Sequence, residues 1–338
     1  MKSLLNWRIW LGIAVSAVSL WLAGRNIPLS EFWDYLGQVN YLWLLPGVPC
    51  ILFATVARGQ RWAILFDKRI SVVDTFWAFS VGNLFNNILP LRAGDAVRII
   101  VLTDKSGIPA VEIAATVVIE RLMDVMTILL LFIVILPFMD VPNFAIQAGL
   151  TFASFVLIGV CILVVMVRYR DWSYRQLEAI LGRLPFLPKS MILKRWLELV
   201  EGLKPITNVQ TITWVLFYSI LGWVLSVSFY YFVLVAFGSQ SPLIESAFLV
   251  VVISLAISLP SSPGFIGVFH LAGQQALVQP FGDAYTESTA FGVILIAYIL
   301  FYITTSVVGG FGLLHFGKRF FTLSQQVTEE IKSQPLSS

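Results

Sequence analysis

Charge, cysteine and histidine are all scarce in this chain. Of its 338 residues only 12% are charged, and there are 2 cysteines and 2 histidines. Cys50 and Cys161 lie in apolar segments without a CxxC spacing or a Cys/His cluster, so we expect core or lipid-facing residues and no structural metal site. The GxSxG, HExxH, P-loop, GxGxxG and DxD patterns are also missing, and we therefore predict no soluble-type catalytic centre, no nucleotide, no cofactor and no metal.

Apolar residues make up most of the sequence. They account for 58% of it, and the mean hydropathy is +0.86. Several segments approach or exceed the ~20 apolar residues that a helix needs to cross a bilayer, and the 11 Trp and 26 Phe suit anchoring at its interfaces. The sequence thus predicts an all-α polytopic membrane protein, with candidate spans at 8–24, 40–57, 72–89, 112–136, 144–167, 213–237, 243–259, 264–279 and 288–316.

The N-terminus superficially resembles a secretory signal peptide. Lys2 and Arg8 precede an apolar run from Ile9 to Gly24. The −3 position of a cut would hold Trp21 or Leu22, whereas signal peptidases need small residues there. We therefore expect an uncleaved first span.

Lysine and arginine are distributed unevenly over the connections. If all nine segments crossed the membrane, the connection 168–212, with eight positive residues, would lie outside, against the positive-inside rule. The conflict disappears if 72–89 turns back within the membrane and if 243–259 and 264–279 form one external hairpin. Twenty of the 22 positive residues are then cytoplasmic, with Arg25 outside and Arg121 in a span. This predicts about six full transmembrane helices plus two re-entrant or broken helical hairpins of opposite topology.

The turns of these two elements share the pattern Leu-Pro-x-x-x-Gly. Proline ends a helix and glycine lets the chain reverse, and non-helical backbone at membrane depth is tolerated only inside protein or along a wet cavity. Opposed broken helices build the midplane sites of inverted-repeat transporters, although chance also produces such short patterns. The predicted structural breaks are Pro90, Gly94, Pro260, Pro263, Gly264 and Gly267.

Polar residues concentrate at the first break. If a helix restarts near Ala93, Asp95 lies in its first turn and shares a face with Arg98. A cytoplasmic loop with snorkelling arginines is one interpretation, and an anion-binding mouth for a lipid phosphate is the other. Three amides within a Phe/Leu-rich helix favour the second, and the candidate residues here are Asn83, Asn86, Asn87, Arg92, Asp95 and Arg98.

A second polar group, Glu120, Arg121 and Asp124, begins an otherwise apolar helix. The two carboxylates are four residues apart and share a face, and Arg121 can neutralise Asp124 at i,i+3. Either the group is a structural ion-pair network that holds this helix to the first hairpin, or it contacts substrate or couples protons. The sequence leaves both open.

Three further polar features lie outside these two groups. His270, six residues after Gly264, is either a packed polar side chain or a site residue at midplane. Arg58 and Arg61 close the second span as positive-inside anchors. The basic connector 168–212 is amphipathic and suits anionic lipid headgroups at a membrane surface better than nucleic acid.

The combined motifs resemble the flippase-like membrane domain of lysylphosphatidylglycerol synthases over about residues 5–320. The residues that carry the resemblance are Arg58-x-x-Arg61-Trp62, Asn83-x-x-Asn86 with Pro90-x-Arg92-x-Gly94-Asp95 and Arg98, Thr116 with Glu120-Arg121-x-x-Asp124, and Pro260-x-x-Pro263-Gly264-x-x-Gly267. The family usually has Gly-Glu at Gly94-Asp95 and often a carboxylate near His270. In family members with two domains, a soluble aminoacyl-transferase domain follows the membrane domain. We expect that domain to be absent here, because this chain ends about twenty residues after its last predicted span.

The resemblance implies lipid translocation rather than aminoacylation. We expect one flippase-like domain, 1–320, with a polar cytoplasmic tail, 321–338, in the plasma membrane of a prokaryote with both termini cytoplasmic. The protein would move a phospholipid or other phosphate-bearing (glyco)lipid without ATP hydrolysis. The alternatives are a membrane-embedded enzyme that modifies a lipid headgroup, with Glu120, Asp124 and His270 as acid–base groups, and an accessory subunit of a lipid or glycolipid pathway. A structural scaffold would not explain the polar residues at both breaks, and the oligomeric state, including a homodimer, is open.

Overall fold

The computed structural model describes residues 2–25, 27–90, 92–139, 143–184, 187–258 and 262–317, and every regular element in these ranges is a helix. This confirms the predicted all-α class. The longer helices are α1 (Lys2–Gly24), α3 (Gly47–Ile64), α4 (Val72–Ile88), α5 (Ala93–Ser106), α6 (Ala110–Ile135), α7 (Asn143–Arg168), α8 (Arg170–Gly182), α9 (Lys189–Leu203), α10 (Val209–Ala236), α11 (Pro242–Ser258), α12 (Val268–Val278) and α13 (Glu287–Phe316). The shorter ones are α2 (Leu29–Gly37), η1 (Tyr41–Leu44), η2 (Leu136–Phe138), η3 (Lys204–Thr207) and η4 (Pro263–Phe265).

Three helices of the described part are long and apolar enough to cross a bilayer. They are Tyr41–Ile64, Val209–Ala236 and Glu287–Phe316, and a fourth follows if α7 and α8, bent by 95° at their junction, count as one span. The chain is thus an all-α membrane protein with fewer unambiguous spans than the sequence suggested. The charged residues of α6 and the short lengths of α11 and α12 account for part of the difference, and six full spans remain a prediction.

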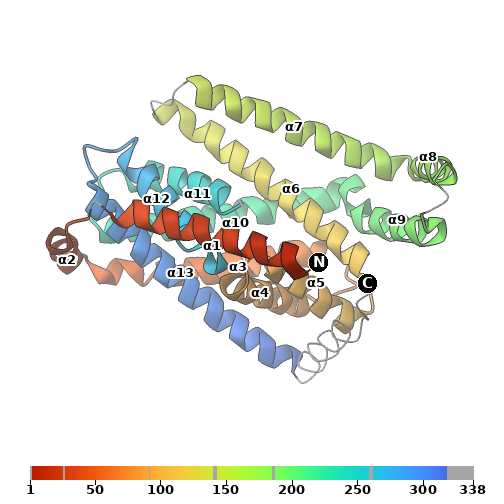
Figure 1. Cartoon of the computed structure of the whole chain (residues 1–338), viewed down its shortest axis with the longest axis horizontal. Helices are drawn as coiled ribbons and strands as arrows, with labels where there is room; N and C mark the ends of the chain where they lie inside the picture. The colour runs from red at the N-terminus through yellow and green to blue at the C-terminus, as the bar shows by residue number, and fades with distance from the viewer. Residues whose placement is uncertain are drawn as a thin grey trace.

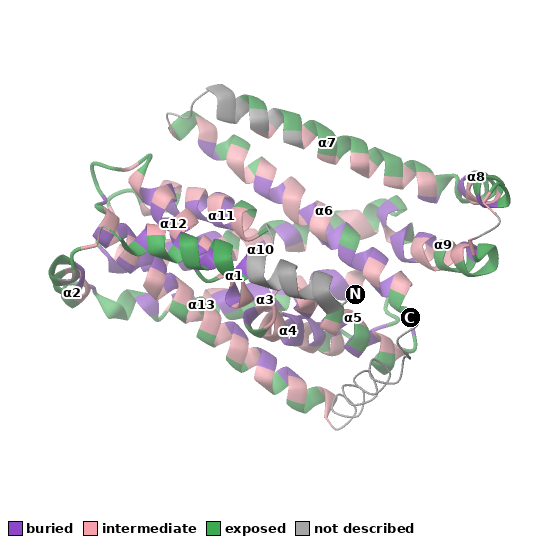
Figure 2. Ribbon diagram, in the orientation of Figure 1, coloured by how far each residue is buried: buried purple, intermediate pink, exposed green. Residues whose placement is uncertain are grey.

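The helices form an elongated bundle (Figure 1). α7 runs along one long edge with α8 at its end, α13 runs along the opposite edge, and α6 crosses obliquely between α7 and the centre. In Figure 2 buried residues are frequent in the helices at the centre of the bundle, whereas the described residues of α7 are mainly exposed or intermediate. Two apolar clusters hold the bundle together, one built around α10, α11 and α13 and the other around α3, α6 and α9.

The first predicted break is a helical hairpin. α4 ends at Ile88, the chain turns through Pro90, and α5 begins at Ala93, which confirms the expected restart. Gly94 is required here because a Cβ at this position would lie 1.9 Å from the Gly82 carbonyl oxygen. The absence of a side chain lets α5 pack directly on the backbone of α4.

The second break is longer than the sequence suggested. α11 ends at Ser258, a 3-10 turn covers Pro263–Phe265, and α12 begins only at Val268 rather than at 264. Gly264 and Gly267 have φ of +66° and +84°, a region that glycine enters without strain and that interrupts a helix. Pro260 lies outside the described residues. Whether either hairpin is re-entrant stays a prediction.

Candidate functional site

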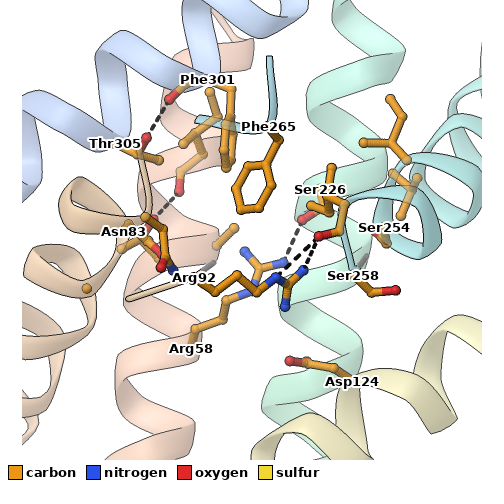
Figure 3. Close-up of a pocket in the computed structure, with 18 of the residues that line it drawn as sticks. Arg58, Asn83, Arg92, Asp124, Ser226, Ser254, Ser258, Phe265, Phe301 and Thr305 are labelled. Atoms are coloured by element: carbon orange, nitrogen blue, oxygen red, sulfur yellow. Dashed lines mark hydrogen bonds between the residues drawn. The ribbon is translucent and has the colours of Figure 1, made fainter. Parts of the chain in front are cut away.

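A cavity of about 280 Å³ lies between the two breaks and the central helices (Figure 3). Its walls come from α3, α4, α5, α6, α10, α11, η4, α12 and α13. Nine of the ten candidate residues named from the sequence line it, which are Asn83, Asn86, Asn87, Arg92, Asp95, Arg98, Glu120, Arg121 and Asp124. Polar side chains up to 41 positions apart in the sequence therefore line the same cavity.

The centre of the charged group is a two-pronged ion pair between α5 and α6. Arg98 donates from both Nη atoms to the two carboxylate oxygens of Glu120, each at 3.1 Å, and both side chains are 1% exposed. The guanidinium also stacks on Trp62, 4.7 Å from the ring centre, and on Phe79. Such a planar, shielded pair fixes the angle between the two helices as well as their charge balance.

Arg61 completes this core from α3. Its Nη1 donates to Asp124 at 2.6 Å and to the Ser219 hydroxyl at 3.0 Å, and its Nη2 lies 3.4 Å from Glu120. Arg61 is 1% exposed, so it is a buried partner of two carboxylates. The interpretation of Arg61 as an interfacial anchor was wrong. A positive residue at the end of a span gives the same sequence pattern whether its side chain faces lipid headgroups or the protein interior.

Arg121 pairs with Asp95 of α5, and not with Asp124, the partner that spacing along α6 suggested. Asp95 accepts a hydrogen bond from Arg121 and lies 3.3 Å from Nε of Arg98. Asp124, the i,i+3 neighbour that we expected Arg121 to neutralise, pairs with Arg61 instead. The Asp95–Arg121 pair is also the most open in the group, with 23% and 40% of the side chains exposed.

Two arginines of the cavity have no carboxylate partner among the described residues. Arg58 donates to the Ser226 hydroxyl at 3.0 Å and lies over the Trp223 ring. Arg92 donates to the Ile257 carbonyl at 2.9 Å from Nη2 and lies over Phe265. Figure 3 shows both reaching into the cavity.

The site as a whole therefore carries surplus positive charge. Five arginines, at 58, 61, 92, 98 and 121, meet three carboxylates, at 95, 120 and 124, and each carboxylate is already paired. Arginine without a carboxylate partner in a partly desolvated site suits a phosphate or another anion.

The three asparagines of α4 have different roles. The Asn86 side chain accepts a hydrogen bond from the Gly94 backbone at 2.9 Å and so ties the two arms of the hairpin. Asn87 donates to Thr305 and Ser306 of α13. Asn83 lines the cavity and makes no side-chain hydrogen bond within the described part. Two of the amides are thus structural, and one faces the open space.

Arg92 ties the two breaks together. It has left-handed backbone dihedrals, φ +54° and ψ +36°, directly before α5. Such a conformation costs a non-glycine residue about 1 kcal/mol or more and concentrates at functional sites. Its bond to Ile257, one residue before the end of α11, satisfies a carbonyl that the helix leaves without an internal partner.

His270 lies behind the cavity wall rather than in it. It is 3% exposed, packs against Phe269, Phe291 and Tyr298, and its Nδ1 has no hydrogen-bond partner. No carboxylate of the described residues is within hydrogen-bond reach. In the same residues, no group of three or more His, Cys, Asp or Glu side chains could hold a metal ion.

Sequence reasoning overlooked Arg58 and the tyrosines of α13 as cavity residues. For Arg58 a signal existed, because it belongs to the Arg-x-x-Arg-Trp motif that carried the family resemblance. Tyr298 and Tyr302 lie in an apolar aromatic-rich span and had no distinguishing pattern.

The comparison with family models identifies the class of this protein. Residues 9–309 match the model described as the lysylphosphatidylglycerol synthase TM region, and the chain belongs to that family. Neither the comparison with curated proteins nor the one with solved structures gave a significant match.

Proposed function

We propose that this protein moves a phosphate-bearing lipid across the membrane without hydrolysing ATP. The observation that carries the proposal is the pair Arg58 and Arg92, two cavity-lining arginines with no carboxylate partner in the described residues. Membership of the lysylphosphatidylglycerol synthase TM-region family supports a lipid as the ligand.

The lining of the cavity suits an amphipathic molecule. Guanidinium groups at one side would bind the phosphate, and Phe265, Phe301 and Trp223 would contact the less polar glycerol and upper acyl chains. At about 280 Å³ the cavity has room for a headgroup and not for a whole lipid, so the acyl chains would stay in the bilayer. The paired residues Arg61, Arg98, Glu120 and Asp124 would brace the helices that form the walls.

The test is translocation of acyl-labelled fluorescent lipids in proteoliposomes, followed by chemical quenching of the outer leaflet. We expect Arg58→Gln and Arg92→Gln each to slow translocation of an anionic phospholipid roughly tenfold or more, because a charge-assisted hydrogen bond contributes about 1.5–3 kcal/mol. Arg175→Gln, on the exposed face of α8, is the matched control and should behave as wild type.

Equal rates for wild type, Arg58→Gln and Arg92→Gln would rule out this site as the lipid path. A wild-type protein that translocates none of a panel of anionic phospholipids and glycolipid phosphates would rule out the transport function itself. A folded, monodisperse elution profile for each variant separates loss of transport from loss of structure.

A headgroup-modifying enzyme is a weaker alternative. Its acid–base set would require His270 beside Glu120 or Asp124, yet His270 lies outside the cavity lining and both carboxylates are bound to arginines. We therefore propose a transporter rather than an enzyme, with membrane lipids as partners. We also propose a prokaryotic plasma membrane as the location and cytoplasmic termini, and the distribution of positive residues supports the latter.

A further inference from the structure

The helix α8 leaves the end of the apolar helix α7 at nearly a right angle. The two helices are bent by 95° at their junction, and Figure 1 shows α8 almost end-on where α7 stops. Large apolar side chains of α7, such as Phe155, Ile158 and Ile162, are more than half exposed, as expected for a helix in contact with lipid. Because α8 is roughly perpendicular to a helix that would cross the bilayer, it would lie along the membrane surface.

One side of α8 exposes large apolar residues. Trp172 and Ile180 are 52% and 55% exposed, and their spacing of eight residues puts them on the same side of the helix. Leu181, nine residues after Trp172 and therefore on the opposite side, is 5% exposed, and α8 packs on α9. Tryptophan is enriched where a bilayer meets water. The exposed side of α8 thus has the composition of a helix at a membrane interface.

Two arginines lie on this same side of α8. Arg175 and Arg183 each follow one of the exposed apolar residues by three positions and therefore share its face of the helix. Both are exposed, and neither has a carboxylate partner among the described residues. We call this surface the outer face of α8, and it is formed by Trp172, Arg175, Gln176, Ile180 and Arg183.

Positive charge is concentrated in the connector that contains α8. Residues 168–212 include eight basic and four acidic residues, a net charge of +4, whereas the whole chain carries +3. Three of the acidic residues already pair with basic residues of the same connector, and these pairs are Glu178–Lys189, Glu198–Arg195 and Glu201–Lys204. The arginines of the outer face are therefore available for an anion outside the protein.

We propose that the outer face of α8 lies in the headgroup layer of the bilayer and binds anionic phospholipids there, at a site separate from the cavity between the two breaks. Trp172 and Ile180 enter the boundary between headgroups and acyl chains, and Arg175 and Arg183 bind lipid phosphates. A soluble acidic partner would match the arginines but not the apolar side chains beside them. This site does not depend on the proposed transport function, and Arg175→Gln leaves the cavity unchanged.

Fluorescent labels at two positions test the location of the outer face. In a protein whose two cysteines are replaced by alanine, one variant carries the label at Gln176→Cys on the outer face, and the control variant carries it at Ser190→Cys. Ser190 lines a groove between α8 and α9 with Tyr174, which is two residues after Trp172 and therefore on the other side of α8. In nanodiscs, lipids brominated in the upper acyl chain should quench the label at 176, and aqueous iodide should quench it roughly threefold less than the label at 190.

The same label at Gln176→Cys tests the recognition of anionic lipids. At equal mole fraction, brominated phosphatidylglycerol should quench it more strongly than brominated phosphatidylcholine. Arg175→Gln and Arg183→Gln should each lower this enrichment of phosphatidylglycerol by up to about fivefold, the effect of one basic residue at an anionic membrane surface. The matched control Lys194→Gln removes one exposed positive charge on the groove side, and screening should keep its effect below about twofold.

Two results would overturn this proposal. Equal quenching of both labels by iodide would show that the outer face is turned to water, as a surface for a soluble acidic partner would be. An unchanged lipid preference in Arg175→Gln and Arg183→Gln, or an equally large loss in Lys194→Gln, would remove these arginines as the lipid-binding groups. All substituted positions are exposed, and a monodisperse elution profile checks that each variant is folded. Neither result bears on movement of lipid through the cavity, which is measured separately.

Discussion

Arg58 and Arg61 lie one turn apart on α3, and their surroundings differ completely. Arg61 is 1% exposed and reaches two carboxylates and a serine hydroxyl. Arg58 lines the cavity and has one hydroxyl and one aromatic ring as partners. The same contrast separates Arg98, paired with Glu120 and Asp95, from Arg92.

We infer from this difference that the paired arginines hold the bundle together and that the unpaired ones are available for a ligand. A buried ion pair adds little net stability over apolar packing, but removing one partner leaves an uncompensated charge. The paired arginines should therefore dominate stability, and the unpaired ones should dominate transport. The following substitutions test that division, from the largest expected effect on stability to the smallest.

Glu120→Gln should be the most damaging. It leaves Arg98 and Arg61 without their shared carboxylate in a site with 1% exposure, and we expect a loss of about 3–5 kcal/mol in the free energy of unfolding. Denaturant titration in detergent measures it. The control Glu201→Gln removes an exposed partner of Lys204 and should stay within about 0.5 kcal/mol of wild type. A Glu120→Gln protein as stable as this control would show that the network is not structural.

Gly94→Ala should come second. The new Cβ would lie 1.9 Å from the Gly82 carbonyl oxygen, so α5 must move away from α4, at a cost of about 1–3 kcal/mol or more. The matched control is Gly159→Ala in α7, where a Cβ meets nothing within 4 Å and the substitution should be neutral or stabilising by up to about 1 kcal/mol. If both variants unfold at the same denaturant concentration, the close packing of α5 on α4 does not require glycine at position 94.

Arg121→Gln should cost about 0–1 kcal/mol. Its pair with Asp95 is partly exposed, so solvent and salt weaken the attraction, and Arg98 remains to neutralise Asp95. The measured difference from wild type should shrink further as salt rises from low to molar concentration. A loss as large as that of Glu120→Gln would place this pair in the structural core instead.

Arg58→Gln should have the smallest effect on stability, within about 0.5 kcal/mol of wild type. It loses a hydrogen bond to Ser226 and a contact with Trp223, but it also removes one of two surplus positive charges from the cavity. A destabilisation of several kcal/mol would mean that Arg58 is a structural residue like Arg61 and would weaken its assignment to the lipid.

Much of the fold was predictable because apolar length and helix breakers are local properties. Each of the nine predicted segments overlaps a helix, and the restart at Ala93 is where Pro90 and the following residues indicated. The start of α12 was missed by four residues because two consecutive turns, each with a positive-φ glycine, follow Pro263. The short helix α2 was not predicted, because nine residues are too few for a clear periodic signal.

The residue types of the site were predictable, and their pairing was not. Spacing along α6 suggested Arg121 with Asp124, yet the partners of both come from other helices, α5 and α3. Intrahelical spacing gives only local neighbours, whereas a buried charge pairs with whatever the tertiary packing brings closest. The same limit explains Arg61, whose partners Asp124 and Ser219 come from α6 and α10.

If the proposed function holds, the surplus of two positive charges would also make the cavity a site of anion exchange. Such a site concentrates small counter-anions from any solution that contains them. A lipid phosphate would then displace these ions on entry, and by mass action its apparent affinity would fall as their concentration rises. Inorganic phosphate and sulfate would thereby compete with the lipid. The rate of transport would then fall as the concentration of these anions rises on the side from which the headgroup enters.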